Sequence, residues 1–272
     1  MDIKGKVAII TGAASGIGRA AALELQKHEI GAIALVDMAD SVHAIADELN
    51  ALNGRETVRA FQGDTTDETF RKRVFDSTRR DFGVVNICVP AAGITRDALA
   101  VRVNREKGRA NIYPIENFRH VLEVNLIAPI YWALELVAQM AEERFSRGAE
   151  QWEPAEGVQG VIVFIGSVSA QGNKGQISYA TGKVGLEGAA STLMKEAMYY
   201  GVRCTVIHPG FTDTPMVRSL GEDYIANHVI PATQIGRLIR PEEIADAICF
   251  LIRNSAVSGQ LWADAGWHPM PT

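Results

Sequence analysis

Short apolar runs alternate with amphipathic segments along most of the chain. The runs have strand length, and the segments between them carry apolar residues three or four positions apart, as the buried face of a helix does. Strands are expected at residues 6–11, 31–36, 57–61, 84–89, 158–165, 202–207 and 259–263, and helices at 17–25, 42–49, 68–82, 117–145, 176–200 and from Pro241 onward. This alternation predicts an α/β fold in which helices cover both faces of a doubly wound parallel sheet. Because the chain has no internal repeat and no low-complexity linker, residues 1–272 are expected to form a single domain.

Two polar stretches, residues 102–111 and 146–160, interrupt this pattern and are expected to be surface excursions. Composition then narrows the class of protein. Of the 272 residues, 47% are hydrophobic and 22% are charged, which excludes a disordered or collagen-like chain. The net charge of −5 and the lack of a basic block argue against a surface for nucleic acid or anionic membranes.

Neither a membrane span nor a signal peptide is expected. Apolar runs such as residues 161–165 are far shorter than the about 20 residues that a spanning helix needs. The three cysteines, Cys88, Cys204 and Cys249, lie in apolar runs and are expected to be buried free thiols. These features favour a protein of the reducing cytoplasm.

The first expected strand ends in a glycine-rich loop, Thr11-Gly12-Ala13-Ala14-Ser15-Gly16-Ile17-Gly18, and a helix follows. Glycine lets the backbone turn tightly and approach a ligand closely. The N-terminus of the helix offers unpaired N–H groups and the positive end of its dipole to a phosphate. Between a strand and a helix, such a loop predicts a dinucleotide site. The alternative is a tight turn that binds no ligand.

An acidic residue, Asp37, ends the second strand 19 residues after Gly18. An acid about 20 residues after the loop accepts hydrogen bonds from ribose hydroxyls and repels a 2′-phosphate. Residues 38–40 contain no Arg or Lys, and Ser15 stands where a basic residue could bind a phosphate. NAD is therefore favoured over NADP as the cofactor.

Asp64 and Thr65 follow the third strand, at the edge of the sheet where ligands bind in such folds. They are expected to contact the adenine, although Asp64 could equally form a helix cap. No metal is expected, because the histidines have no metal-ligand spacing: His28, His43, His120, His228 and His268. His208 is expected to be structural.

Three residues carry the candidate chemistry. Tyr179 and Lys183 are four positions apart, so they share one face of the expected helix. A free tyrosine has a pKa of about 10 and is a weak acid or base at neutral pH, and a neighbouring ammonium is expected to lower that pKa. Ser167 follows the strand at residues 158–165, where its hydroxyl could hold the carbonyl or alcohol oxygen of a substrate.

Over residues 4–267 the chain resembles the short-chain dehydrogenase/reductase family. The matching motifs are Thr11-Gly12-x3-Gly16-Ile17-Gly18, Asp64, Asn125, Ser167, Tyr179-x3-Lys183 and Pro209-Gly210-x3-Thr214. The resemblance implies a Rossmann-like fold and an NAD-dependent oxidoreductase that interconverts a secondary alcohol and a ketone. In such an enzyme the cofactor moves the hydride, and the protein supplies position and electrostatics.

The resemblance also implies a role for each matching residue. Tyr179 would exchange a proton with the substrate oxygen, Lys183 would lower its pKa and hold the nicotinamide ribose, and Ser167 would orient the carbonyl. Asn125 would kink its helix and hold a water of the proton relay. The residues expected to bind the cofactor are Gly12, Ser15, Gly16, Ile17, Gly18, Asp37, Asp64, Thr65, Ala92, Gly93, Tyr179, Lys183, Pro209, Gly210, Phe211, Thr212 and Thr214.

The chain departs from the family pattern after the fourth strand, where the usual Asn-Asn-Ala-Gly is Pro90-Ala91-Ala92-Gly93. Both asparagines are missing, and Pro90 has no backbone N–H. The side-chain hydrogen bonds that usually tie this loop to neighbouring strands are therefore expected to be absent.

Two subgroups of the family remain open. Residues 93–97 and 172–176 resemble the 3-oxoacyl-acyl carrier protein reductases, which commonly use NADP. The longer segments at 101–115 and before residue 158, with the proline-containing tail, resemble the 3-hydroxyacyl-CoA and 17β-hydroxysteroid dehydrogenases. This second group uses NAD, in agreement with Asp37. A 3-hydroxyacyl thioester or a hydroxysteroid-like alcohol is therefore the favoured substrate.

Candidate walls of the substrate pocket are Val168, Ile177, Phe211 and an expected helix at residues 216–228, which could form a mobile lid. Family members pair the helices that match residues 117–145 and 180–200, so a homodimer or homotetramer is implied. A regulator that binds a dinucleotide without turnover is the alternative of another class. The presence of the serine, tyrosine and lysine together argues against it.

Overall fold

The computed structural model describes residues 1–266, so His268 and the proline-containing tail lie outside the described residues. At its centre is a sheet with the strand order β3-β2-β1-β4-β7-β8-β9. These strands are β1 (Val7–Thr11), β2 (Ala32–Asp37), β3 (Val58–Gln62), β4 (Ile87–Pro90), β7 (Gly160–Ile165), β8 (Val202–Pro209) and β9 (Gly259–Ala263). Every pairing between neighbours is parallel, as the alternation of strands and helices predicts.

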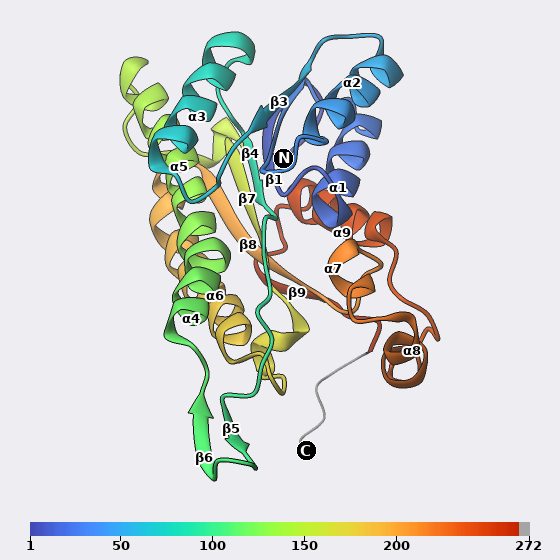
Figure 1. Ribbon diagram of the computed structural model, residues 1–272. Coiled ribbons are helices and arrows are strands. Elements are labelled where there is room, and N and C mark those ends of the chain that lie inside the picture. The colour runs from blue at the N-terminus through green and yellow to red at the C-terminus, as the bar shows by residue number, and fades with distance from the viewer. Residues whose placement is uncertain (267–272) are drawn as a thin grey trace.

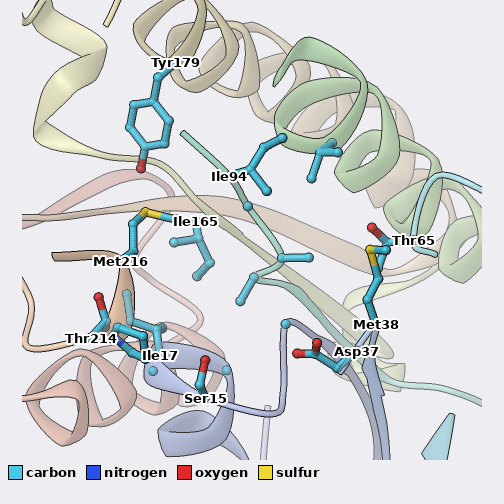
Figure 2. Close-up of a pocket in the computed structure, with 18 of the residues that line it drawn as sticks. Ser15, Ile17, Asp37, Met38, Thr65, Ile94, Ile165, Tyr179, Thr214 and Met216 are labelled. Atoms are coloured by element: carbon cyan, nitrogen blue, oxygen red, sulfur yellow. The ribbon is translucent and has the colours of Figure 1, made fainter. Parts of the chain in front are cut away.

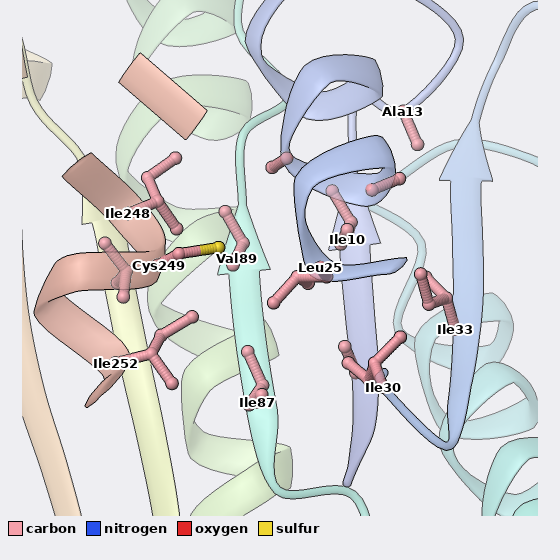
Figure 3. Packing of buried hydrophobic residues seen from close by; sticks show 14 of the residues in the cluster. Ile10, Ala13, Leu25, Ile30, Ile33, Ile87, Val89, Ile248, Cys249 and Ile252 are labelled. Carbon is pink, nitrogen blue, oxygen red and sulfur yellow. The ribbon is translucent and has the colours of Figure 1, made fainter. Parts of the chain in front are cut away.

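Helices cover both faces of this sheet (Figure 1). On one face lie α1 (Gly16–Lys27), α2 (Val42–Asn53) and α9 (Pro241–Arg253), and on the other lie α3 (Glu68–Phe82), α4 (Ile115–Leu122), α5 (Ala128–Ser146) and α6 (Ile177–Glu196). Successive strand residues point to opposite faces, so the core is divided in two. Ile10 and Ile33 pack with Leu25 of α1 and Ile248 of α9 (Figure 3), whereas Ile9 packs in a second cluster with residues of α5. The doubly wound α/β fold is confirmed, and all three cysteines are buried free thiols as expected.

The long helix expected at residues 117–145 is present, and it is interrupted near its middle. A π-type turn at Glu123–Ile127 separates α4 from α5, and the buried Asn125 lies within it. The expected kink at Asn125 is therefore observed as a π turn, a feature often found at functional sites.

Within residues 1–266, the segment Ile115–Ser146 is the one helix that is long and apolar enough to cross a membrane by length and composition. The sequence analysis did not identify this helix as a candidate span, because it contains no long uninterrupted apolar run. Core helices meet the same criterion, and Trp132, Leu136 and Met140 of this helix are buried against the sheet.

Both polar excursions are ordered. Residues 101–112 form an antiparallel hairpin of β5 (Val101–Asn104) and β6 (Arg109–Ile112), which projects beyond α4 in Figure 1. The segment at 146–160 is tied to the body, because the guanidinium of Arg144 donates two hydrogen bonds to the Glu156 carboxylate at 2.6 and 3.0 Å. Residues 102–111 lie on the surface as expected, but the hairpin was not foreseen, because its apolar–polar alternation was overlooked beside its many charges.

The helix expected at residues 216–228 is broken into α7 (Pro215–Arg218), α8 (Glu222–Tyr224) and a π-type turn at Ile225–Val229. Gly221 separates the first two with a φ of +92°, a left-handed conformation that ends a helix. Ile225 and Val229 are buried against Leu238. This end of the expected lid is therefore part of a small core, and the prediction of one continuous helix was wrong.

Candidate active site

The glycine-rich loop lies at the carboxyl end of β1, next to β4, where the order of the strands changes direction. Gly12 has a φ of +66°, and a Cβ there would lie 2.7 Å from the backbone nitrogen of Ala92. A Cβ on Gly18 would lie 2.3 Å from the carbonyl oxygen of Gly12. Ser15 begins α1 without a side-chain capping bond in the described chain, which leaves the first N–H groups of the helix for a ligand. The loop thus has the tight backbone packing of a phosphate cradle.

A cavity of about 490 Å³ opens in front of this loop, with Tyr179 at one end and Asp37 and Thr65 at the other (Figure 2). The loops that follow β1, β2, β3, β4 and β8 all contribute to its wall. The expected cofactor residues that line it are Gly12, Ser15, Gly16, Ile17, Gly18, Asp37, Asp64, Thr65, Ala92, Gly93, Tyr179, Lys183 and Thr214. The sequence analysis missed Met38, Ile94, Arg96 and Ile165, whose side chains share no motif that could have revealed them.

The two aspartates at this end of the cavity also hold backbone. Asp37 accepts hydrogen bonds from the N–H groups of Ala14 in the glycine loop (3.0 Å) and Ala39 (2.9 Å), which fixes its carboxylate beside the loop. Asp64 accepts from both the backbone and the hydroxyl of Thr66. Helix α3 is capped by Asp67 instead. Asp64 therefore stabilises a turn while lining the cavity.

The loop after β4 is tied down although it lacks the two asparagines. The Thr11 hydroxyl accepts a hydrogen bond from the N–H of Ala92 (3.1 Å). The Asn125 side chain donates to the Ile94 carbonyl (2.8 Å) and accepts from the Ile94 N–H (2.9 Å). The bonds of the two missing asparagines were expected to be absent, and Thr11 and Asn125 hold the loop from neighbouring elements instead. The π turn in the long helix places Asn125 where it can make this pair of bonds.

Ser167, Tyr179 and Lys183 meet where β7 ends against the first turns of α6. Tyr179 and Ser167 line the same small cavity, and the Ser167 hydroxyl acts to lower the pKa of the Tyr179 phenol. The ammonium of Lys183 is buried, donates to the Ile165 carbonyl at 2.7 Å, and lies 5.5 Å from the centre of the Tyr179 ring. The three side chains predicted to carry the chemistry are thus brought together.

The pKa values of this group differ from the expectation. Burial raises the pKa of Tyr179 to about 12, although the Ser167 hydroxyl acts in the opposite direction. Burial also lowers the pKa of Lys183 to about 8, because an ammonium loses its hydration there. The expected lowering of the pKa of Tyr179 by Lys183 is wrong for this structure, in which desolvation is the larger effect. At neutral pH the phenol keeps its proton.

A second cavity, of about 100 Å³, adjoins the first. Tyr179 and Met216 line both, whereas Ser167, Val168, Gly210 and Phe211 line only the second. Val168 and Phe211 are therefore pocket walls as expected. Ile177 lines neither cavity and is 45% exposed on the surface of α6, so the expectation that it forms a pocket wall was wrong. Of the remaining expected cofactor residues, Pro209 and Thr212 are buried.

Gln176 is a wall residue of the second cavity that the sequence analysis did not single out. Its amide nitrogen donates to the Asp97 carboxylate (2.7 Å), and its amide oxygen accepts from the hydroxyl of Ser169 (2.8 Å). These bonds join the loop after β4 to the loop after β7. In the sequence Gln176 stands only at the end of a family-like stretch and at the start of an expected helix, with no signal of this contact.

The known family model of short chain dehydrogenases matches residues 6–225 of this chain. The protein belongs to the short chain dehydrogenase family. It is accordingly an oxidoreductase that acts on CH–OH groups, and its family binds a nicotinamide dinucleotide. The glycine cradle and the cavity in front of it fit such a cofactor.

Similar proteins include two 3-oxoacyl-[acyl-carrier-protein] reductases. That of Escherichia coli (strain K12) is 33% identical over 257 residues, which cover 94% of this chain and 93% of that protein. That of Thermotoga maritima is 32% identical over 264 residues, or 96% of each chain. A crystal structure of a short-chain type dehydrogenase/reductase from Mycobacterium marinum has a TM-score of 0.82, 23% sequence identity, and covers 98% of this chain and 96% of its own. That structure supports the fold.

In this dehydrogenase a buried histidine lies directly behind Ser167. The Nδ1 atom of His208 lies 3.3 Å from the backbone nitrogen and 3.1 Å from the carbonyl oxygen of Ser167, and its ring stacks on Trp262. Its Nε2 atom lies 3.7 Å from the Glu187 carboxylate. Burial lowers the pKa of His208, although Glu187 acts in the opposite direction. The ring is structural, as expected, and it is most stable in its neutral form.

We expect His208 to make the free energy of unfolding fall in mild acid. Below a pH of about 6.5 the unfolded chain binds a proton on this imidazole that the folded chain does not bind, which costs up to about 1.4 kcal/mol per pH unit. The variant His208→Asn keeps an acceptor near the Nδ1 position but cannot titrate. Urea unfolding between pH 7 and pH 5 should therefore show a steeper loss of stability for the wild type than for the variant. If the free energy of unfolding fell equally with pH in both proteins, His208 would not be the neutral buried group described here.

Proposed function

We propose that the protein is an NAD-dependent dehydrogenase that interconverts a secondary alcohol and a ketone in a 3-hydroxyacyl thioester or a hydroxysteroid-like substrate. One observation carries this proposal: Tyr179 lines both the cavity before the glycine loop and the smaller cavity of Ser167. A group bound in the first cavity and a substrate bound in the second would meet at its phenol. Proximity of this kind is a large part of enzymatic rate enhancement.

The residues around Tyr179 suggest how the proton is handled. Tyr179 is protonated at neutral pH, so its phenol would donate a proton to the carbonyl oxygen during reduction and take it back during oxidation. Ser167 would hold the same oxygen by a hydrogen bond. The ammonium of Lys183, fixed by the Ile165 carbonyl, would stabilise negative charge on the phenol oxygen. The bound dinucleotide would supply or accept the hydride.

Asn125 would act on the site through the backbone. Its paired hydrogen bonds to Ile94 hold the loop that carries Gly93, and Gly93 lies beside the ammonium of Lys183. We propose that Asn125 fixes the wall of the cofactor cavity and supports the proton relay from within the π turn.

The cofactor is proposed to be NAD. The Asp37 carboxylate is fixed beside the glycine loop by two N–H groups and lines the cofactor cavity. It would accept hydrogen bonds from a ribose and repel a 2′-phosphate. The reductases similar to this chain leave NADP as the competing choice, which a binding measurement can decide.

The double variant Asp37→Ser, Met38→Arg is expected to reverse this preference. Loss of the carboxylate and gain of a cation should weaken NADH binding and tighten NADPH binding, each by about tenfold to a hundredfold, the effect of one or two charged hydrogen bonds. Fluorescence titration of both cofactors measures this directly. Asp40→Ser is the matched control, since Asp40 is an exposed acid of the same loop and does not line the cavity. A wild type that binds NADPH as tightly as NADH would contradict the role of Asp37.

The likeness to 3-oxoacyl-[acyl-carrier-protein] reductases supports a second candidate function, the reduction of a thioester on a carrier protein. The two candidate functions are distinguished by initial rates with acetoacetyl-CoA and with acetoacetyl-acyl carrier protein. The first proposal expects similar kcat/KM values for both thioesters. A strong preference for the carrier-protein substrate would favour the second candidate, and activity with neither would shift the search to other secondary alcohols, including steroids.

Three further properties are proposed on structural grounds. Residues 1–272 would form one domain, since strands from both ends of the chain share one sheet. The chain would form a homodimer or homotetramer, because α5 and α6 expose apolar side chains such as Tyr131 and Val184. A cytoplasmic location would suit its buried free thiols. A dinucleotide-binding regulator without turnover remains the alternative of another class, and loss of activity in a Tyr179 variant would argue against it.

A further inference from the structure

The β5–β6 hairpin has an apolar face that nothing in the described chain covers. Val101 pairs with Ile112 and Val103 with Ala110, so these four side chains share one face, because strand residues alternate between faces. Val101 and Val103 are each 57% exposed and Ile112 is 79% exposed. A two-stranded hairpin needs a surface to pack on to be stable in water. The pattern therefore indicates a hairpin that is buried against another body.

The hairpin is also basic in an acidic protein. Residues 101–112 hold four cations, Arg102, Arg105, Lys107 and Arg109, against one acid, Glu106, for a net charge of +3. All four cations are exposed: Arg105 and Lys107 lie in the turn, and Arg102 and Arg109 lie on the face opposite Val101 and Val103. A partner of this hairpin should offer an apolar contact within an acidic surface.

The same chain offers such a surface at residues 142–157, which we call the acidic segment. It holds five glutamates and two arginines, for a net charge of −3. Glu142 and Glu143 pair with Arg79, and Glu156 pairs with Arg144, so the acids of this segment that are open to a partner are Glu150 and Glu153. Phe145, at its start, is 86% exposed, and Glu150 and Glu153 are exposed nearby in the sequence. The charge and the apolar contact of this segment both complement the hairpin.

The two surfaces cannot meet within one chain. The hairpin precedes the helix Ile115–Ser146, and the acidic segment follows from its last turn. A helix of 32 residues is about 48 Å long at a rise of about 1.5 Å per residue. Figure 1 shows the hairpin at the α4 end of this helix, away from the end of α5. The apolar face of the hairpin must therefore be covered by another molecule.

A second copy of this chain can bring its acidic segment next to the hairpin of the first. Ile127, Tyr131 and Leu134 are 39–49% exposed, lie three or four positions apart, and stand near the middle of the same long helix. When this patch pairs with itself across a two-fold axis perpendicular to the helix, the two helices run antiparallel. The first turn of one helix then lies beside the last turn of the other, and each hairpin extends over the acidic segment of the opposite copy.

We propose that the β5–β6 hairpin docks in trans on the acidic segment of a second copy, with its apolar face against Phe145 and the turn cations Arg105 and Lys107 near Glu150 and Glu153. The proposal rests on the homo-oligomer proposed above and gives the hairpin its function. The docked hairpin also supports the site of its own chain. At its base the phenol of Tyr113 donates to the Arg96 carbonyl (2.6 Å) and bonds to the hydroxyl of Ser178 (3.0 Å), the residue before Tyr179.

Disulfide trapping in the full-length protein tests this arrangement. The double variant Val103→Cys, Phe145→Cys should give a covalent dimer on a non-reducing gel after mild oxidation, because the native cysteines are buried and the two new thiols lie too far apart to join within one chain. Each single variant should stay largely uncrosslinked. Arg102→Cys with Phe145→Cys is the matched control, since Arg102 lies on the opposite face of the hairpin, and it should crosslink at least about fivefold less.

Light scattering on the same samples separates the two proposals. An oligomer in which the double variant does not crosslink would overturn the hairpin docking and leave the oligomer standing. A monomer at all concentrations would overturn both.

A charge exchange gives an independent readout. Arg105→Glu with Lys107→Glu, both in the turn of the hairpin, should raise the dissociation constant of the oligomer by about tenfold, and addition of Glu150→Lys with Glu153→Lys should restore most of the loss. Absence of any recovery would contradict the proposed contact.

Discussion

Replacing Tyr179 with phenylalanine is expected to lower kcat by about 10²–10⁴-fold, the usual contribution of one positioned acid or base. The loss follows because the phenol that lines both cavities is the group placed to exchange a proton with a substrate oxygen. The aromatic ring is retained, so the walls of both cavities and the affinity for the dinucleotide should change little. Steady-state kinetics and a fluorescence titration of the cofactor measure the two effects separately.

Tyr199→Phe is the matched control for this variant. Tyr199 is 47% exposed, packs edge to face with Tyr200, and lines neither cavity, so kcat should remain within about twofold of the wild type. If Tyr179→Phe retained full turnover, another residue would have to supply the proton and the proposed mechanism would be wrong.

Replacing Gly18 with alanine should abolish useful cofactor binding. The added Cβ would lie 2.3 Å from the Gly12 carbonyl oxygen, so the backbone of the glycine loop would have to move. Overpacking of this kind costs about 1–3 kcal/mol of stability. Because the same backbone would cradle the pyrophosphate, we expect the dissociation constant for NADH to rise by at least about a hundredfold.

Gly54→Ala separates loss of binding from loss of stability. Gly54 ends α2 with a φ of +63°, and a Cβ there meets nothing within 4 Å. Alanine in this left-handed conformation should cost about 1–2 kcal/mol of stability and leave NADH binding unchanged. If the Gly18→Ala variant bound NADH with a dissociation constant within about threefold of the wild type, the glycine loop would not be part of the cofactor site.

Much of the fold follows from local pattern. Helix α3 occupies Glu68–Phe82, as its spacing predicts, and Asp67 caps it. Strands such as β1 and β2 lie within a residue or so of their expected bounds, because both faces are covered and the strands are apolar throughout. The hairpin at 101–112 was missed because its alternation is confined to four-residue strands whose polar face is charged.

The candidate site was predicted from the sequence only in part. Spacing alone placed Tyr179 and Lys183 on one helix face and Asp37 near the glycine loop. It could not show that Thr11 and Asn125 would tie down the loop after β4, since those bonds join segments far apart in the chain. Nor could it give the pKa of Tyr179, which depends on how deeply the tertiary structure buries the phenol.

The central claim is that this protein transfers hydride between NAD and a secondary alcohol or ketone at Tyr179. The most direct test is the initial rate with acetoacetyl-CoA at equal concentrations of NADH and NADPH. We expect rapid oxidation of NADH that depends on the ketone, and at most slow oxidation of NADPH. Turnover with NADPH alone would contradict the role given to Asp37 and favour reduction of carrier-protein thioesters.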